Sequence, residues 1–116
     1  MTAYLLARLH LPTETHPDLL EYQRRIEAAL APFSGRFLVR AGAIESLEGD
    51  WRGDVVLIEF PSLDHARGFY GSPAYRQIIP LRVRHVTGDL ILVRGVAPAP
   101  GATAVPAVPA GPQGTG

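Results

Sequence analysis

Residues 48–75 read EGDWRGDVVLIEFPSLDHARGFYGSPAY, and they decide the fold. The apolar run Val55–Phe60 has the length and the β-branched content of a buried strand. The proline that follows cannot donate a ladder hydrogen bond, and Ser62 is a good N-cap, so a helix begins there. Ser72 and Pro73 then supply the cap and the first residue of a second helix. This stretch therefore predicts a strand and two consecutive helices.

Two strands and a helix are predicted on the N-terminal side. Ala3–Leu11 alternates within an apolar background, which is typical of a strand. Pro17 suits the first position of a helix, with Thr15 or His16 as its cap. Arg36–Gly42 predicts the second strand, and a long hairpin loop with a bulge connects it to the third.

The C-terminal side completes the domain. Gly71 is a natural C-terminal cap for the first of the two later helices, and Pro80 should kink or end the second. We expect the second to bury one apolar side, formed by Tyr75, Ile78, Ile79 and Val83. Leu90–Arg94 predicts the fourth strand. Residues 97–116 are mostly Pro, Ala and Gly without a periodic pattern, so the chain is predicted to be one domain, residues 1–96, followed by a disordered tail.

The predicted order βαββαβ indicates an α+β, ferredoxin-like fold, with a four-stranded antiparallel sheet and its helices on one face. Side-chain alternation places a wholly apolar set beneath the helices. That set is Ala3, Leu5, Ala7, Leu9, Phe37, Val39, Ala41, Val56, Ile58, Phe60, Ile91 and Val93. A bulge in any strand would reverse part of this assignment.

The opposite face of the predicted sheet mixes apolar and charged side chains. It holds Tyr4, Leu6, Leu38, Val55, Leu57, Leu90 and Leu92, together with Arg8, His10, Arg40, Glu59 and Arg94. This face is too apolar to face water, and no further helix remains to cover it. We therefore expect the same face of a second copy to cover it, which makes the protein a homodimer.

Four motifs carry a resemblance to a known family. They are Gly35–Gly42, Leu47–Trp51, Val56–Ser62 and Tyr70–Tyr75, with Arg82 beyond them. Together they resemble the domain-of-unknown-function 1330 (DUF1330) family over Ala3–Val96. The resemblance implies a ferredoxin-like dimeric α+β barrel and supplies no established reaction. Its fold relatives include cofactor-independent monooxygenases, haem-degrading enzymes and small-molecule isomerases, so several chemistries stay open.

Composition excludes several function classes. The 116 residues include 11 basic and 11 acidic side chains, so the net charge is zero. Nucleic acids and anionic membranes attract basic surfaces, so neither is an expected partner. Every basic side chain is Arg, and Lys and Cys are absent, which excludes Schiff-base and thiol chemistry. The N-terminal residues lack a signal-peptide pattern and no run is a membrane span, so we expect a cytoplasmic protein.

Three charged residues are the first candidates for a functional site. Glu59 ends an apolar strand, and a carboxylate there suits a catalytic base or a ligand anchor. The alternative is a structural ion pair with Arg40 or Arg8. Because the second and third strands form a hairpin, we expect Arg40 and Glu59 to be cross-strand neighbours. Arg40 and Arg82 could form a fork for a carboxylate or phosphate, although Arg82 could equally be solvated.

Ser72 and Tyr75 complete the candidate catalytic set, and Tyr22 and Trp51 complete the ligand-binding set. Ser72 starts a helix whose free N–H groups favour an anion, and its alternative role is that of a plain cap. The tyrosines are alternatively core residues, and Trp51 either lines a pocket or closes the partner interface. We expect six of these residues to converge, unless the third strand's carboxylate and the helix start lie on opposite sides of the sheet. The six are Tyr22, Arg40, Glu59, Ser72, Tyr75 and Arg82.

The four histidines, His10, His16, His65 and His85, show no metal-ligand spacing. We therefore predict no metal, haem or other cofactor. His85 and Asp89 are close in sequence and are candidates for an acid–base pair.

Two function classes follow from these residues. The first is a cofactor-independent enzyme that acts on a small anionic or aromatic metabolite. The second is a non-catalytic dimeric module that binds small ligands or is stress-associated. Catalysis requires a perturbed group beside an open cavity, whereas binding requires only the arginine fork and aromatic walls.

Overall fold

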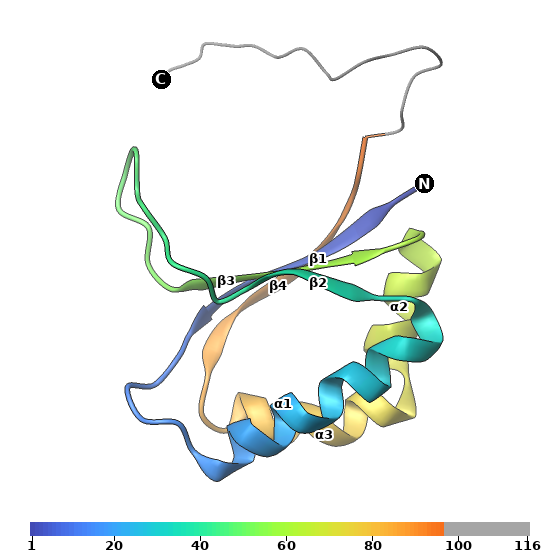
Figure 1. The fold of residues 1–116 in the computed structure, drawn as a ribbon, viewed down its shortest axis with the longest axis horizontal. Coiled ribbons are helices and arrows are strands. Elements are labelled where there is room, and N and C mark those ends of the chain that lie inside the picture. Colours follow the sequence, from blue (N-terminus) through green and yellow to red (C-terminus); the bar gives the residue numbers. More distant parts are fainter. Residues whose placement is uncertain (97–116) are drawn as a thin grey trace.

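The structure is a computed structural model that describes residues 1–96 (Figure 1). The disordered tail predicted for residues 97–116 lies outside the described residues. The elements are β1 (Ala3–His10), α1 (Pro17–Leu30), the 3₁₀ turn η1 (Ala31–Phe33), β2 (Arg36–Arg40), β3 (Asp54–Phe60), α2 (Leu63–Gly71), α3 (Pro73–Val83) and β4 (Thr87–Arg94).

The four strands form one antiparallel sheet in the order β2-β3-β1-β4. All three α-helices lie on one face of this sheet, as Figure 1 shows. This arrangement confirms the predicted ferredoxin-like α+β fold. Among residues 1–96, no helix has both the length and the apolar character needed to cross a membrane.

Local hydrogen bonds explain where the helices begin. The side chain of His16 caps α1 by accepting from the Asp18 N–H at 3.0 Å. Ser62 caps α2 by accepting from the His65 N–H at 3.1 Å, and Ser72 caps α3. Polar caps of this kind satisfy N–H groups that have no partner within the helix.

Two expectations about the helix ends are wrong. Gly71 is the last residue of α2 and not a cap beyond it, because Ser72, in extended conformation, already ends the helix. Of the two effects expected of Pro80, ending the helix is wrong, because α3 continues past it to Val83. Val83 is exposed, and Arg82 is buried in its place.

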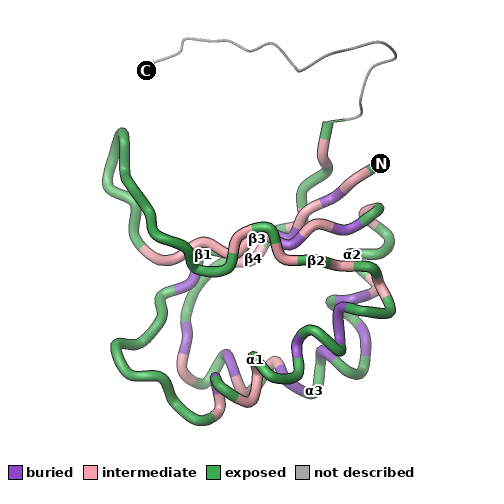
Figure 2. Tube along the Cα trace, viewed as in Figure 1, coloured by how far each residue is buried: buried purple, intermediate pink, exposed green. Residues whose placement is uncertain are grey.

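The helices and the sheet enclose one apolar core. Figure 2 shows buried segments along the helices and on the strands that they cover. The largest side chains that are fully buried are Phe60, Phe69, Tyr75 and Ile78. The Phe69 and Tyr75 rings lie 4.3 Å apart between centroids, so aromatic packing joins α2 to α3.

The predicted alternation is wrong in β4. Leu90 and Leu92 pack against the core. Ile91 and Val93 are 52% and 44% exposed on the outer face of the sheet, which is the face opposite the helices. The cause is the pairing with β1, where Leu92 lies opposite the buried Leu5. Cross-strand partners share a face of the sheet, so this pairing fixes the inner set. Both alternating sets of this strand are apolar, which is why the sequence alone did not decide between them.

The predicted alternation also fails in β2, because of a bulge. Phe37 lies opposite Ile58, but Val39 lies opposite Leu57, so the register shifts by one residue at Leu38. Val39 therefore moves to the outer face and Arg40 to the helix side. The strand also ends earlier than predicted, because Ala41 adopts a left-handed φ of 56°.

Candidate functional site

A cavity of about 110 Å³ lies between the helix-covered face of the sheet and helices α1 and α3. Its walls are mostly aliphatic side chains from α1 and from β1, β3 and β4. The polar side chains that line it are Tyr22, Gln23, Arg40, Tyr75 and Arg82. Among the described residues, no carboxylate and no imidazole lines this cavity. An apolar pocket with a few convergent polar groups is the usual form of a small-molecule site.

Arg82 is the most unusual of these residues. Its side chain is on α3, only 7% of the residue is exposed, and no carboxylate among residues 1–96 pairs with it. Its Nε atom is buried without a hydrogen-bond partner. The guanidinium lies 5.9 Å from the centre of the Tyr22 ring. A buried cation without an anion is costly, so an anion bound beside this guanidinium would offset part of that cost.

Two tyrosine hydroxyls stand beside this cation. The Tyr22 and Tyr75 hydroxyl oxygens are 2.8 Å apart, so one hydroxyl donates to the other and the second O–H stays free to donate. Burial, with Tyr75 close by, raises the pKa of Tyr22 far above its ordinary value of 10.0. Tyr22 is therefore a neutral donor at physiological pH and not a base. Together with Arg82, the pair complements an oxyanion.

Arg40 reaches the same cavity because the bulge in β2 turns it toward the helices. Its guanidinium pairs with Glu27 of α1 at 3.0 Å and lies 4.1 Å from the centre of the Phe37 ring. Arg40 is thus held at the edge of the cavity by an anion and an aromatic ring. Among residues 1–96, no such anion pairs with Arg82.

Glu59 lies on the other side of the sheet. Its carboxylate pairs with Arg36 at 2.7 Å, and the two residues are opposite each other in the β2–β3 ladder. The expectation that Arg40 and Glu59 are cross-strand neighbours is wrong, because the ladder pairs Arg40 with Val56. Glu59 is in a structural ion pair, and its partner is Arg36, which was not among the partners expected.

Ser72 and Trp51 also lie away from the cavity. The Ser72 hydroxyl donates to the Phe69 carbonyl at 2.7 Å and accepts from the Tyr75 N–H at 3.3 Å. Trp51 is 46% exposed on the loop between β2 and β3, where its indole N–H donates to the Gly53 carbonyl at 3.1 Å. The structure therefore brings together Tyr22, Arg40, Tyr75 and Arg82, and leaves Glu59, Ser72 and Trp51 outside this group.

Sequence reasoning missed the burial of Arg82 and the place of Gln23 in the cavity wall. A signal for Arg82 was present, because Tyr75, Ile78 and Arg82 follow one another at spacings of three and four. Residues at those spacings share one face of a helix, and this face is the buried one. Gln23 follows Tyr22 directly in the sequence, and nothing in the pattern distinguished it.

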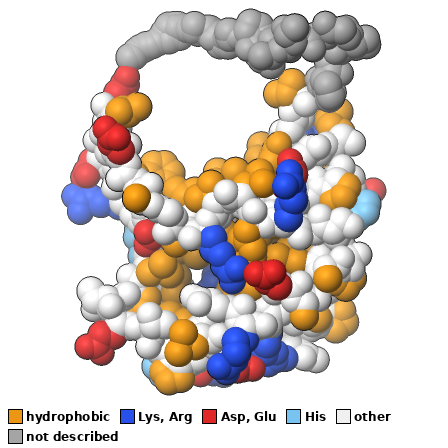
Figure 3. Space-filling model, in the orientation of Figure 1, with side chains coloured by type: hydrophobic (Ala, Val, Ile, Leu, Met, Phe, Trp, Pro, Cys, Tyr) orange, Lys and Arg blue, Asp and Glu red, His pale blue; other side chains and the backbone are white. Residues whose placement is uncertain are grey.

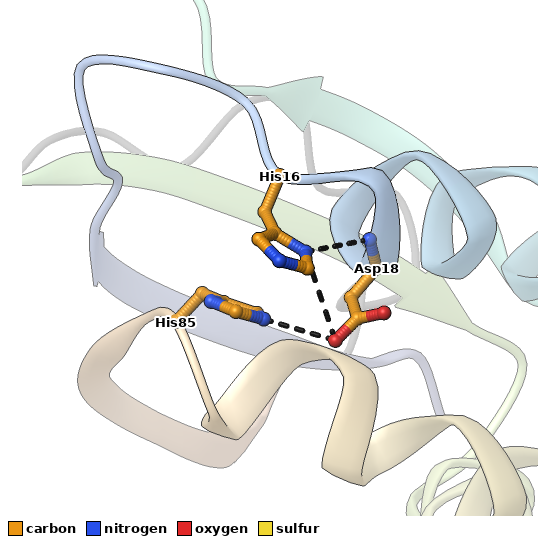
Figure 4. A group of neighbouring side chains, drawn as sticks. All are labelled: His16, Asp18 and His85. Atoms are coloured by element: carbon orange, nitrogen blue, oxygen red, sulfur yellow. Dashed lines mark hydrogen bonds and ion pairs between the residues drawn. The ribbon is translucent and has the colours of Figure 1, made fainter.

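The histidines also pair differently from what was expected. His85 does not contact Asp89, which pairs with Arg8 at 3.1 Å. The His85 Nε2 atom lies instead 2.9 Å from Asp18 Oδ2, and the His16 ring stacks on the His85 ring (Figure 4). The start of α1 and the end of α3 are thus joined by a polar cluster that the sequence did not indicate.

Several solved structures share this fold. A protein of unknown function from Rhodopseudomonas palustris is 19% identical with a TM-score of 0.65, and the match covers 84% of each chain. SnoaB, a cofactor-independent oxygenase from Streptomyces nogalater, is 17% identical with a TM-score of 0.55, over 85% of this chain and 97% of that one. An uncharacterised NIPSNAP domain protein from Burkholderia xenovorans is 14% identical with a TM-score of 0.50, over 86% and 99%. At such identities the likeness shows the fold alone.

The sequence comparisons are more specific about the family. No curated protein matches the sequence. The family model described as "Domain of unknown function (DUF1330)" matches residues 2–96, which is most of the chain, and this confirms the resemblance noted from its motifs. The chain therefore belongs to the DUF1330 family.

Proposed function

We propose that this protein binds a small organic anion, whose charged group meets Arg82 and whose apolar part fills the cavity. The observation that carries the proposal is the buried guanidinium of Arg82, which lines the cavity without an anion. A carboxylate would supply the missing charge and accept hydrogen bonds from the guanidinium. Charge-assisted hydrogen bonds of this kind contribute about 1.5–3 kcal/mol each.

The size of the cavity limits the ligand. A volume of about 110 Å³ is smaller than the roughly 150 Å³ of an engineered apolar cavity that holds benzene. The aliphatic walls favour a hydrocarbon body, and Arg82 with the neighbouring Tyr22–Tyr75 pair would anchor the charged group. A short-chain monocarboxylic acid fits both conditions.

Of the two function classes, we favour the one that binds a ligand without catalysing a reaction. A reaction that moves a proton at neutral pH needs a base with a pKa near neutrality. Among the described residues, the titratable groups that line the cavity are tyrosines and arginines. Tyr22 is held in its neutral form, and the Arg82 guanidinium stays charged. This set donates hydrogen bonds and does not accept protons.

A cofactor-independent enzyme is the second candidate, and one observation favours it. The Tyr22–Tyr75 pair and Arg82 form a donor set that would stabilise an enolate or another oxyanion as it develops. A substrate that is acidic enough to ionise without a protein base could react in such a site. SnoaB, which shares the fold, is described as a cofactor-independent oxygenase, and that activity defines an assay for this candidate.

The proposed assembly is a homodimer through the outer face of the sheet. Figure 3 shows hydrophobic side chains gathered on this face, and Leu38, Ile91 and Val93 are exposed there. The face stays apolar after the corrections in β2 and β4. Leu90 and Leu92 are no longer assigned to it, but Val39, Ile91 and Val93 now are. A second copy is the partner that the apolar character of this face favours.

Thermal denaturation with matched ligands tests the proposed binding. Propionate and butyrate should raise the melting temperature of the wild-type chain, whereas propionamide and butyramide, which have the same shape without the charge, should not. Arg82→Met should abolish the difference, and Arg76→Met, on an exposed position of the same helix, should preserve it. If acids and amides act alike on the wild type, the proposal is wrong.

A further inference from the structure

A second group of side chains lies outside the cavity, at the point where α1 begins and α3 ends. Figure 4 shows His16, Asp18 and His85 pointing toward one another. Their ligand atoms all lie within 4.8 Å of one another, although His85 is 67 residues away from Asp18 in the sequence. His85 and Asp18 are half-buried, and His16 is exposed.

We propose that His16, Asp18 and His85 bind a divalent transition-metal ion of borderline softness, of which Zn²⁺ is the test case. Two imidazoles and one carboxylate form a common three-ligand set for zinc, with a fourth position left to water. The site is distinct from the proposed anion site, because none of these three side chains lines the cavity.

The distances within the group suit this assignment. Asp18 Oδ2 lies 2.9 Å from His85 Nε2 and 3.7 Å from His16 Nδ1. In a tetrahedral zinc site with bonds of about 2.0–2.1 Å, neighbouring ligand atoms are about 3.3 Å apart. The two observed distances lie on either side of that value, so the carboxylate oxygen is already about as far from each imidazole nitrogen as it would be around a zinc ion.

The charge of the carboxylate also suits a cation. The Asp18 side chain supplies an oxygen ligand, and its Oδ2 atom faces both the His85 and the His16 imidazole. The Arg84 guanidinium is also close to this carboxylate, with its Nη1 atom 3.5 Å from Asp18 Oδ2. The Arg84 side chain is mostly exposed, so it can turn away into solvent when a metal enters.

Metal binding would require two rearrangements. The His16 and His85 rings are stacked with centroids 3.8 Å apart, and they must turn so that their lone pairs converge on one point. His16 Nδ1 also accepts the hydrogen bond from the Asp18 N–H that caps α1. The ion would replace these contacts with stronger ones, and it would fasten the start of α1 to the end of α3.

Calorimetric titration of the full, untagged chain tests the proposal. After treatment with a chelator, the wild type should bind Zn²⁺ with one ion per chain and a micromolar or lower Kd, and it should not bind Mg²⁺. His85→Gln and His16→Gln should each weaken the affinity for Zn²⁺ by at least about tenfold. His10→Gln is the matched control, because His10 is an exposed histidine outside the group, and it should bind as the wild type does.

A second measurement on the wild type covers the case in which a variant does not fold. In nitrogen-15 spectra of the histidine rings, Zn²⁺ should shift the resonances of His16 and His85 and leave those of His10 and His65 in place. Binding that is absent, unchanged in both ligand variants or equally reduced in His10→Gln would overturn the proposal. None of these results depends on whether the cavity binds an anion.

Discussion

The two faces of the sheet differ in whether their charged side chains have partners of opposite charge. On the outer face, Glu59 is neutralised by Arg36 across the ladder, and Arg8 pairs with Asp89. On the inner face, Arg82 is buried against aromatic rings with no carboxylate among the described residues to pair with it. The outer pairs are exposed and contribute little to stability or chemistry. The inner cation costs stability, and this cost is the reason for which we propose that a ligand binds there.

The two faces also differ in what covers them. Helices cover the inner face and leave a small cavity, whereas the outer face is apolar and has no cover among the described residues. We therefore assign the proposed ligand recognition to the inner face and the proposed assembly to the outer face.

The largest expected effect is on the outer face. Leu57→Arg should dissociate the proposed homodimer, because it places a charge without a partner in the seam between two copies. A buried charge without a partner destabilises a protein by about 3–5 kcal/mol, so the variant should also unfold more readily. Light scattering and chemical denaturation measure the two effects.

The matched control for that variant is Leu20→Arg, on the exposed side of α1. It should leave both the molecular mass and the stability close to those of the wild type. A wild-type chain that is monomeric at micromolar concentration, or a Leu57→Arg variant that stays dimeric, would contradict the role assigned to the outer face.

The next effect is on the inner face and has the opposite sign. Without ligand, Arg82→Met should be as stable as the wild type or more stable, by up to about 4 kcal/mol, because an apolar side chain replaces a buried cation. Denaturant unfolding measures the change. A clear loss of stability would show that Arg82 has a structural partner and is not kept for a ligand.

A smaller effect is expected from Tyr22 at alkaline pH. Its pKa is raised in the folded protein above the ordinary value of 10.0, so the folded state keeps a proton that the unfolded state loses. The free energy of unfolding should therefore fall as the pH rises above 10.0. In Tyr22→Phe, which has no such proton, the fall should be shallower. Equal pH profiles for the two proteins would contradict the burial assigned to this hydroxyl.

The smallest effect is expected from Glu59→Gln. The carboxylate pairs with an exposed arginine on the outer face, so its loss should change the stability by less than about 1 kcal/mol. Ligand binding should not change, because Glu59 does not line the cavity. If Glu59→Gln lost ligand binding, Glu59 would have to be part of the site.

The sequence predicted the order of elements and the alternation of the two central strands. In β1 and β3, the inner positions are apolar and strand pairing on both sides holds them in place. The two edge strands were assigned wrongly, for different reasons. A bulge at Leu38 shifts β2, and β4 is apolar at Leu90–Val93 in both alternating sets, so only its pairing with β1 decides the faces.

The candidate site was predictable only in part. Tyr22, Tyr75, Arg40 and Arg82 were all chosen from the sequence, and the structure places them around one cavity. Arg40 arrived there through the bulge, which reversed the face that its position predicted. The group formed by His16, Asp18 and His85 could not be predicted, because it depends on how α1 and α3 pack and not on any local pattern.

The central claim is that Arg82 is held ready for an anion, and its own Nε–H group reports on this most directly. In nitrogen-15 spectra, the Arg82 Nε–H resonance should shift progressively as propionate is added and reach a plateau, because a buried donor without a partner gains an acceptor. Propionamide at the same concentrations should leave it in place. A resonance that stays unmoved by propionate, or that moves equally with propionamide, would contradict the account.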